Sequence, residues 1–159
     1  MDENLLSLST SVGKALLERA YTISTAESCT SGLLSHTLTA ISGSSAYFIG
    51  GVVAYSNEIK VSMLDVQIET LEKFGAVSVQ TAQEMAEGIR ERFQTEIGLS
   101  TTGIAGPTGG TPTKPVGLVC MGISTPEKTL AFDCHFTGER LQVMHSTVVE
   151  LLTRLTEML

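Results

Sequence analysis

A serine at a predicted strand-to-helix junction is the first residue whose type and place suit chemistry. Ser28 lies in Thr25-Ala-Glu-Ser-Cys-Thr30, where a strand predicted over 22–26 gives way to a helix predicted to begin near Thr30. Ligands of open α/β sheets bind at the carboxyl ends of strands, and a helix start offers free N–H groups to an oxyanion. A hydroxyl there is a candidate nucleophile. The local sequence alone favours the commoner role of a helix cap.

A lysine downstream is a candidate partner for that serine. Lys60 closes the segment Tyr55-Ser-Asn-Glu-Ile-Lys60, which follows a strand predicted over 48–55. A serine nucleophile needs a base, and a desolvated lysine with a lowered pKa can serve. The three histidines are dispersed, without metal-ligand spacing or an acidic partner. The alternatives are a solvated helix lysine for Lys60 and a core side chain for Tyr55.

Two further segments carry groups that suit an anion. The glycine-rich stretch 102–110 follows a predicted strand, and its backbone can point N–H groups at a phosphate or carboxylate. It matches no nucleotide-binding fingerprint, so a flexible surface loop is the alternative. Gly43-Ser-Ser45 could donate in the same way, and Arg140 has the forked donors that suit phosphate. An ordinary turn and a surface arginine are the alternatives there.

Length and composition predict one soluble domain over residues 1–159. The net charge of −7, with only ten basic residues, argues against binding to nucleic acid or to anionic membranes. Three cysteines without C-x-x-C spacing predict neither a disulfide framework nor a zinc site, and we expect no metal. The apolar runs are too short to cross a bilayer, and Met1-Asp-Glu-Asn4 lacks the basic start of a signal peptide. A cytoplasmic location is therefore expected.

Hydrophobic periodicity predicts the elements that position these residues. Apolar residues at helical spacing predict helices over the first twenty residues, from near Ser78 to Phe93, and over 144–159. Five strands are predicted between them, over 22–26, 48–55, 96–102, 116–124 and 129–136. Strands that alternate with helices predict a largely parallel sheet covered on both faces. Only four residues separate the last two strands, which predicts an antiparallel hairpin, a mixed sheet and a final strand at an edge.

Taken together, the motifs resemble the C-terminal domain of the competence/damage-inducible protein CinA, whose stand-alone form is a nicotinamide-nucleotide amidase. The resemblance runs along nearly the whole chain in an ordered set of short segments. These segments are Thr25-Ala-Glu-Ser-Cys-Thr30, Gly43-Ser-Ser45, Tyr55-Ser-Asn-Glu58 with Lys60, Gly75-Ala-Val-Ser78, Gly103-Ile-Ala-Gly-Pro107 with Gly109-Gly110, Lys114-Pro-Val-Gly117, and Gly138 with Arg140.

The resemblance implies hydrolysis of the carboxamide of nicotinamide mononucleotide to nicotinate mononucleotide and ammonia, in pyridine-nucleotide recycling. It implies a serine-lysine mechanism, with Ser28 as nucleophile, Lys60 as general base and Tyr55 orienting both, without metal or cofactor. The N–H groups after Ser28 would face the oxyanion. The implied fold is a three-layer α/β/α sandwich with a mixed, mostly parallel sheet, usually a homodimer.

The small-molecule nucleotide substrate would be held mainly by donors at glycines and helix starts. The expected substrate-binding residues are Thr30, Gly32, Gly43, Ser44, Ser45, Asn57, Gly103, Gly106 and Arg140. Members of the family commonly have two glycines after Ser-Cys-Thr, whereas this chain has Ser31-Gly32. Two alternatives remain: a nucleotide-binding or regulatory module that turns nothing over, and an amidase acting on another small carboxamide.

Overall fold

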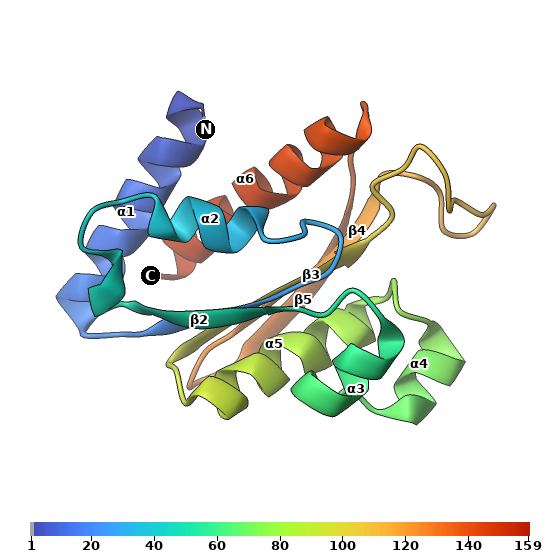
Figure 1. Cartoon of the computed structure of the whole chain (residues 1–159), viewed down its shortest axis with the longest axis horizontal. Helices are drawn as coiled ribbons and strands as arrows, with labels where there is room; N and C mark the ends of the chain where they lie inside the picture. Colours follow the sequence, from blue (N-terminus) through green and yellow to red (C-terminus); the bar gives the residue numbers. More distant parts are fainter. Residues whose placement is uncertain (1) are drawn as a thin grey trace.

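The computed structural model describes residues 2–159 and shows three layers (Figure 1). One face of the sheet is covered by α1 (Glu3–Arg19), α2 (Leu33–Thr39) and α6 (Arg140–Met158). The other face is covered by α3 (Asn57–Leu64), α4 (Ile68–Phe74) and α5 (Val79–Phe93). The predicted α/β/α sandwich is confirmed. Within residues 2–159, no helix combines the length and apolar character needed to cross a membrane.

The sheet has five strands in the order β2-β1-β3-β4-β5. Their bounds are Ile23–Glu27 for β1, Phe48–Val53 for β2, Ile97–Gly103 for β3, Leu118–Ser124 for β4 and Thr129–His135 for β5. β1 pairs in parallel with β2 and β3, whereas β4 is antiparallel to both β3 and β5. Only β4 therefore opposes the other strands, which confirms the mixed, mostly parallel sheet with β5 at an edge.

Burial follows the predicted periodicity. The central strands β1 and β4 are buried along their whole length, whereas the edge strand β5 is only partly buried. The inward stripes of α1 and α6 meet the sheet in one core, to which α1 contributes Leu5, Val12 and Leu16 and α6 contributes Val148, Leu151, Leu152 and Leu155. A smaller cluster on the other face packs Met85 and Ile89 of α5 against Ala26 and Ala54. Apolar burial on both faces stabilises the sheet that carries the site.

Two details of the helices differ from what the hydrophobic periodicity predicts. The helix expected near Thr30 begins at Leu33, because Ser31 (φ 52°) and Gly32 (φ 99°) adopt left-handed backbone conformations that interrupt it. The short helix α3 agrees with the helix expected around Lys60, whereas α4 lies between α3 and α5, where the pattern placed no element. By contrast, the helix start near Ser78 is confirmed, because the Ser78 hydroxyl accepts a hydrogen bond from the N–H of Thr81 as an N-cap.

The strand order creates a crevice at the carboxyl end of β1. From β1 the chain passes through α2, on one face, to β2. It then returns through α3, α4 and α5, on the other face, to β3 on the opposite side of β1. Such a reversal of strand order is where open α/β sheets bind ligands. Ser28 follows the last residue of β1 directly and so lies at this point.

Candidate active site

The side chains of Ser28 and Lys60 meet at the carboxyl end of β1. The Nζ of Lys60 lies 3.2 Å from the Oγ of Ser28 and donates a second hydrogen bond, 2.8 Å long, to the carbonyl oxygen of Ala54. Lys60 reaches this place because α3 starts only a few residues after β2, with Ser56 as its N-cap. Because β2 and β1 are parallel neighbours, the segment after β2 lies beside the turn after β1. The fold thus brings together the two residues named first from the sequence.

Lys60 is buried, with 2 % of its surface exposed. Burial lowers the pKa of its ammonium group, and the negative charge that Cys29 carries only when its thiol ionises acts in the opposite direction. No carboxylate of residues 2–159 forms a salt bridge with Lys60 to offset this desolvation. A lysine with a lowered pKa is more readily neutral near physiological pH, and its lone pair can then accept a proton from the Ser28 hydroxyl.

A buried carboxylate fixes the turn that carries Ser28. Glu27 has no exposed surface, and its Oε1 accepts hydrogen bonds from the N–H and the hydroxyl of Ser35, at 2.8 and 2.6 Å. Its Oε2 accepts from the N–H groups of Gly32 and Leu34, both at 3.0 Å, and from the Thr30 hydroxyl at 2.6 Å. The carboxylate therefore satisfies the free N–H groups at the start of α2 and complements its dipole. This holds the Ser28 backbone between β1 and α2.

A half-open cavity of about 240 Å³ lies over the serine-lysine pair. Its lining comes from five places: the turn after β1, the start of α3, the loop before α5, the end of β3 with the loop that follows, and the first residue of α6. The lining residues are Ser28, Cys29, Tyr55, Asn57, Lys60, Ala76, Val77, Thr102, Gly103, Ala105 and Arg140. The volume lies just under the roughly 300–1,000 Å³ of typical ligand pockets. The cavity therefore suits a small ring with one polar substituent, and a longer ligand would extend past its mouth.

Cys29 lines the cavity but is poorly suited to be the nucleophile. Burial raises the pKa of its thiol to about 12, so the thiol is protonated at neutral pH. Its backbone contributes differently, because within residues 2–159 the N–H of Cys29 donates to no other residue and approaches only its own sulfur. That N–H comes directly after Ser28, which is where acyl-transfer enzymes place an oxyanion donor.

Tyr55, Asn57 and Arg140 lie at the cavity, and Arg140 links its two sides. The Arg140 Nη1 donates to the carbonyl oxygen of Gly106, and its Nη2 donates to the hydroxyl of Tyr55, both at 3.0 Å. The Tyr55 side chain is 60 % exposed, so it lies at the rim. In this structure the Ala54 carbonyl accepts a hydrogen bond from Lys60, and the Tyr55 hydroxyl accepts one from Arg140. The orienting role expected for Tyr55 stays a prediction.

Several expected substrate-binding residues lie away from the cavity. Thr30 is fully buried, and both its hydroxyl and the N–H of Gly32 are bonded to Glu27. Gly43, Ser44 and Ser45 precede β2 and so lie at the amino end of that strand, whereas Ser28 lies at the carboxyl end of its parallel neighbour β1. Within one chain these residues therefore do not line the cavity, and their contact with a substrate stays a prediction. Gly103 does line the cavity, while Gly106 contributes through its carbonyl group to Arg140.

Four residues of the site have only indirect signals in the sequence: Glu27, Thr102, Ala76 and Val77. Glu27 was part of a recognised motif, and its signal was a carboxylate at the end of a strand in an otherwise apolar setting. Thr102 lines the cavity and donates to the carbonyl oxygen of Ala76 at 2.8 Å; its position at a strand end was the signal. Ala76 and Val77 form a cavity wall, and only their place in the Gly75–Ser78 motif pointed to them. Within residues 2–159, no group of three His, Cys, Asp or Glu side chains is arranged to hold a metal.

The sequence is similar to those of several known proteins. A family model described as the CinA C-terminal domain matches residues 5–159. A CinA-like protein of Cyanothece sp. is 53 % identical over 134 residues, which are 84 % of this chain and 32 % of that protein. A putative competence-damage inducible protein of Halothermothrix orenii is 52 % identical over 139 residues, 87 % of this chain and 34 % of that protein. The chain thus spans about a third of the length of these curated relatives.

Solved structures of similar proteins have the same fold as this chain. The competence/damage inducible protein CihA from Agrobacterium tumefaciens has a TM-score of 0.96 to this chain at 38 % identity, and the match covers 99 % of this chain and 96 % of that one. The competence damage-inducible protein A from Klebsiella pneumoniae has a TM-score of 0.94 at 35 % identity, covering 98 % and 96 % of the two chains. The layers and strand order described above are therefore those of solved proteins.

Proposed function

The chain belongs to the CinA C-terminal domain family, and on that premise we propose that it is a serine-lysine amidase that hydrolyses the carboxamide of nicotinamide mononucleotide. One observation carries the proposal: the Nζ of buried Lys60 lies 3.2 Å from the Oγ of Ser28 in a cavity. A hydroxyl and a desolvated amine at this distance are the parts that acyl transfer needs. The products are nicotinate mononucleotide and ammonia.

The reaction follows from these groups. Neutral Lys60 takes the hydroxyl proton as the Ser28 oxygen attacks the carboxamide carbon, and the N–H of Cys29 faces the oxyanion that forms. Lys60, now an ammonium, returns the proton to the amide nitrogen, so that ammonia leaves and an ester to Ser28 remains. A water molecule then attacks the ester with Lys60 again as base, which releases the carboxylate and restores the Ser28 hydroxyl. The Ala54 carbonyl keeps the lysine nitrogen in place throughout.

The shape and charge of the cavity support a nucleotide substrate. The pyridine carboxamide fits a cavity of about 240 Å³, and the ribose phosphate would extend through its mouth. The guanidinium group of Arg140 lies at the mouth of the cavity, and its forked N–H donors suit a phosphate group. In a chain with a net charge of −7, such a local cation is needed to attract an anionic substrate.

The first test is turnover itself. We expect purified protein to release ammonia and nicotinate mononucleotide in equal amounts from nicotinamide mononucleotide, measured by an ammonia assay and by chromatography. Nicotinamide riboside, which lacks the phosphate, is expected to react with a higher KM because it gives Arg140 no anion to bind. Binding of the nucleotide without ammonia release would favour a non-catalytic module. Faster turnover of an unrelated small amide would favour a different substrate.

The phosphate contact is tested by Arg140→Met. We expect KM for nicotinamide mononucleotide to rise about 10- to 100-fold, because a hydrogen bond to a charged group contributes about 1.5–3 kcal/mol. The KM for nicotinamide riboside should change little. Steady-state kinetics on both substrates measures this, with Arg19→Met on α1 as the control for loss of an exposed arginine. Equal losses on both substrates would instead assign Arg140 a purely structural role, as the link between Gly106 and Tyr55.

A further inference from the structure

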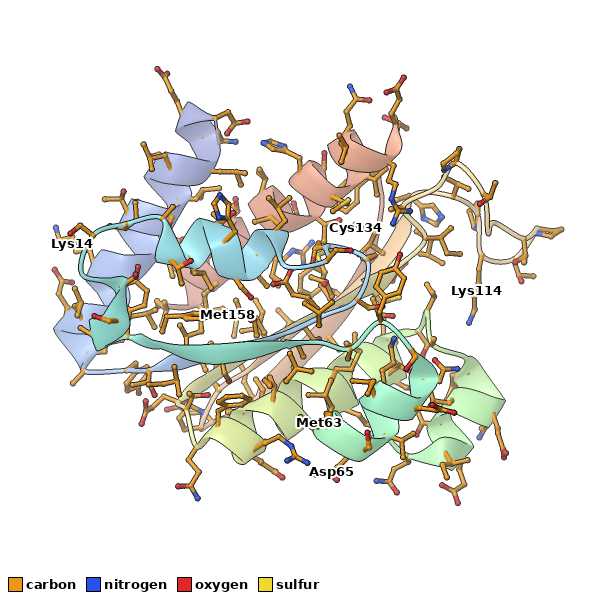
Figure 2. All side chains as sticks on the ribbon, viewed as in Figure 1. Lys14, Met63, Asp65, Lys114, Cys134 and Met158 are labelled. Carbon is orange, nitrogen blue, oxygen red and sulfur yellow. The ribbon has the colours of Figure 1, made fainter. Side chains whose placement is uncertain are left out.

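Two of the segments that carry the family resemblance supply no reacting group to the proposed amidase reaction, yet the fold brings them together. One is the loop 75–78 between α4 and α5, and the other is Lys114 in the long loop between β3 and β4. The ammonium group of Lys114 donates a hydrogen bond to the carbonyl oxygen of Phe74, the last residue of α4. Figure 2 shows the Lys114 side chain turning back from its projecting loop toward the α4 side of the molecule.

The loop 75–78 is held in place by side chains that donate hydrogen bonds to three successive backbone carbonyl groups, those of residues 74, 75 and 76. Lys114 bonds to the carbonyl of Phe74. The carbonyl of Gly75 accepts from the hydroxyls of Ser78 and Thr81, at 2.9 and 2.8 Å, and Thr102 holds the next carbonyl at 2.8 Å. Lys114 is the only one of these donors that comes from a long loop. The segment they fix includes Ala76 and Val77, which form a wall of the catalytic cavity.

Gly75 makes room for the lysine. A Cβ at this position would lie 2.8 Å from the Nζ of Lys114, closer than side-chain atoms normally approach, and the φ of Gly75 is 80°. The positive φ therefore favours a glycine, and a Cβ there would also press on the flexible end of the Lys114 side chain. The C-terminal end of a helix, where carbonyl groups lack partners and the dipole is negative, also suits a cation.

The loop that carries Lys114 is itself ordered by hydrogen bonds. At its tip, the N–H of Thr111 donates to the carbonyl oxygen of Lys114 at 2.8 Å, and the N–H of Lys114 donates to the Thr111 hydroxyl at 3.0 Å. At its base, the N–H of Gly117 donates to the carbonyl oxygen of Ile104 at 2.7 Å. The same loop accepts the Arg140 bond at Gly106. It therefore contacts Arg140 at the cavity mouth and the end of α4, next to the residues of the cavity wall.

We propose that Lys114 is a positioning residue that clamps the glycine-rich loop onto the end of α4 and thereby fixes the Ala76–Val77 wall of the catalytic cavity. Its amine is engaged by Phe74, and Lys114 itself is not among the residues that line the cavity. Lys114 therefore affects substrate binding only by fixing the position of Ala76 and Val77. The catalytic part of this proposal rests on the proposed function, because the wall matters to turnover only if the cavity binds the substrate.

A wall that contacts the substrate equally in the ground state and the transition state affects binding more than the chemical step. Its loosening should therefore raise KM and leave kcat nearly unchanged. For Lys114→Met we expect a KM for nicotinamide mononucleotide higher by on the order of tenfold, because the hydrogen bond lost has a charged donor. We expect kcat to stay within about threefold, because Ser28 and Lys60 are held by other contacts.

The experiment compares Lys114→Met, Lys114→Arg and Lys128→Met by steady-state kinetics and by amide hydrogen exchange. Lys114→Met should speed exchange in residues 75–78 and raise KM, and Lys114→Arg should reverse part of both effects, because a guanidinium can also donate to Phe74. Lys128, an exposed lysine in the β4–β5 turn, is the matched control, and its substitution should change neither readout.

Each outcome decides the proposal. Unchanged exchange in residues 75–78 of Lys114→Met would overturn the clamp, and faster exchange with an unaltered KM would overturn its effect on the substrate. A large fall in kcat that Lys114→Arg does not relieve would also contradict it. If the unsubstituted protein releases no ammonia, the proposed function fails, and the exchange rates still decide by themselves whether Lys114 holds the loop.

Discussion

Substitution of Ser28 by alanine is expected to reduce kcat for nicotinamide mononucleotide by at least about 10⁴-fold, because loss of the nucleophile of an acyl-transfer enzyme removes the covalent route. The neighbouring Cys29 should not replace it, since burial raises the pKa of that thiol to about 12 and keeps it protonated. The measurement is ammonia release under saturating substrate, with enzyme concentrations high enough to detect the residual rate.

The fold of Ser28→Ala should be intact. The side chain of Ser28 bonds only to Lys60, while its backbone N–H donates to the carbonyl oxygen of Thr101 and keeps the turn in place. Substrate binding measured by calorimetry and the thermal midpoint should therefore stay near those of the unsubstituted protein. Ser31→Ala, in the same turn but exposed and outside the cavity, is the matched control and should keep its activity. Retention of more than about a tenth of kcat in Ser28→Ala would contradict the nucleophile assignment.

Most of the elements, and the approach of Ser28 to Lys60, follow from the sequence because they depend on local patterns and on the topology that these patterns predict. Helical spacing in α1, α5 and α6 predicts which face is buried, and the short turn 125–128 predicts the antiparallel pair β4–β5, which is confirmed. Ser28 and Lys60 both come soon after strands that are parallel neighbours, so their approach follows from the topology. The family resemblance named them, and the geometry brings them to 3.2 Å.

The remainder of the site depends on contacts between distant segments, which no local pattern records. Tyr55 and Arg140 are 85 residues apart in the sequence, and their hydrogen bond at the cavity mouth has no counterpart in any local pattern. Glycine-serine turns have the same donors at either end of a sheet, and Gly43 to Ser45 were expected at the site although they precede β2. In a pair of parallel strands, a turn before one strand and a turn after the other lie at opposite ends of the sheet. The predicted parallel sheet therefore already places Gly43 to Ser45 at the end opposite Ser28.

Ser31 shows how the structure interprets a departure from a family pattern. Its φ is 52°, in the left-handed region that glycine adopts most readily, which explains why a glycine is common there. The residue is exposed and does not line the cavity, so its side chain does not crowd a bound substrate. The departure therefore concerns the backbone of the turn rather than the room for a ligand.

The second prediction with a large expected effect concerns Lys60 as the general base. Lys60→Met is expected to lower kcat/KM by at least about 10³-fold, and Lys60→Arg by a similar factor, because a guanidinium stays protonated and accepts no proton. In the unsubstituted enzyme, kcat/KM should rise with pH as Lys60 loses its proton. Since burial lowers the pKa of Lys60, the midpoint of that rise should lie below the roughly 10.4 of an ordinary lysine. An arginine variant with normal turnover would rule out Lys60 as the base.

The same lowered pKa predicts a signature in stability that is independent of turnover. Between the folded and unfolded pKa values of Lys60, the unfolded chain binds more protons, so the free energy of unfolding decreases as pH falls through that window. Lys60→Met keeps the side-chain length without the titrating amine, so this part of the pH dependence should vanish. Denaturant unfolding across the alkaline range measures it, with exposed Lys14→Met as the control. Parallel stability curves for the unsubstituted protein and Lys60→Met would mean that Lys60 has an ordinary pKa in the folded chain, and the buried amine could not then serve as a base near neutral pH.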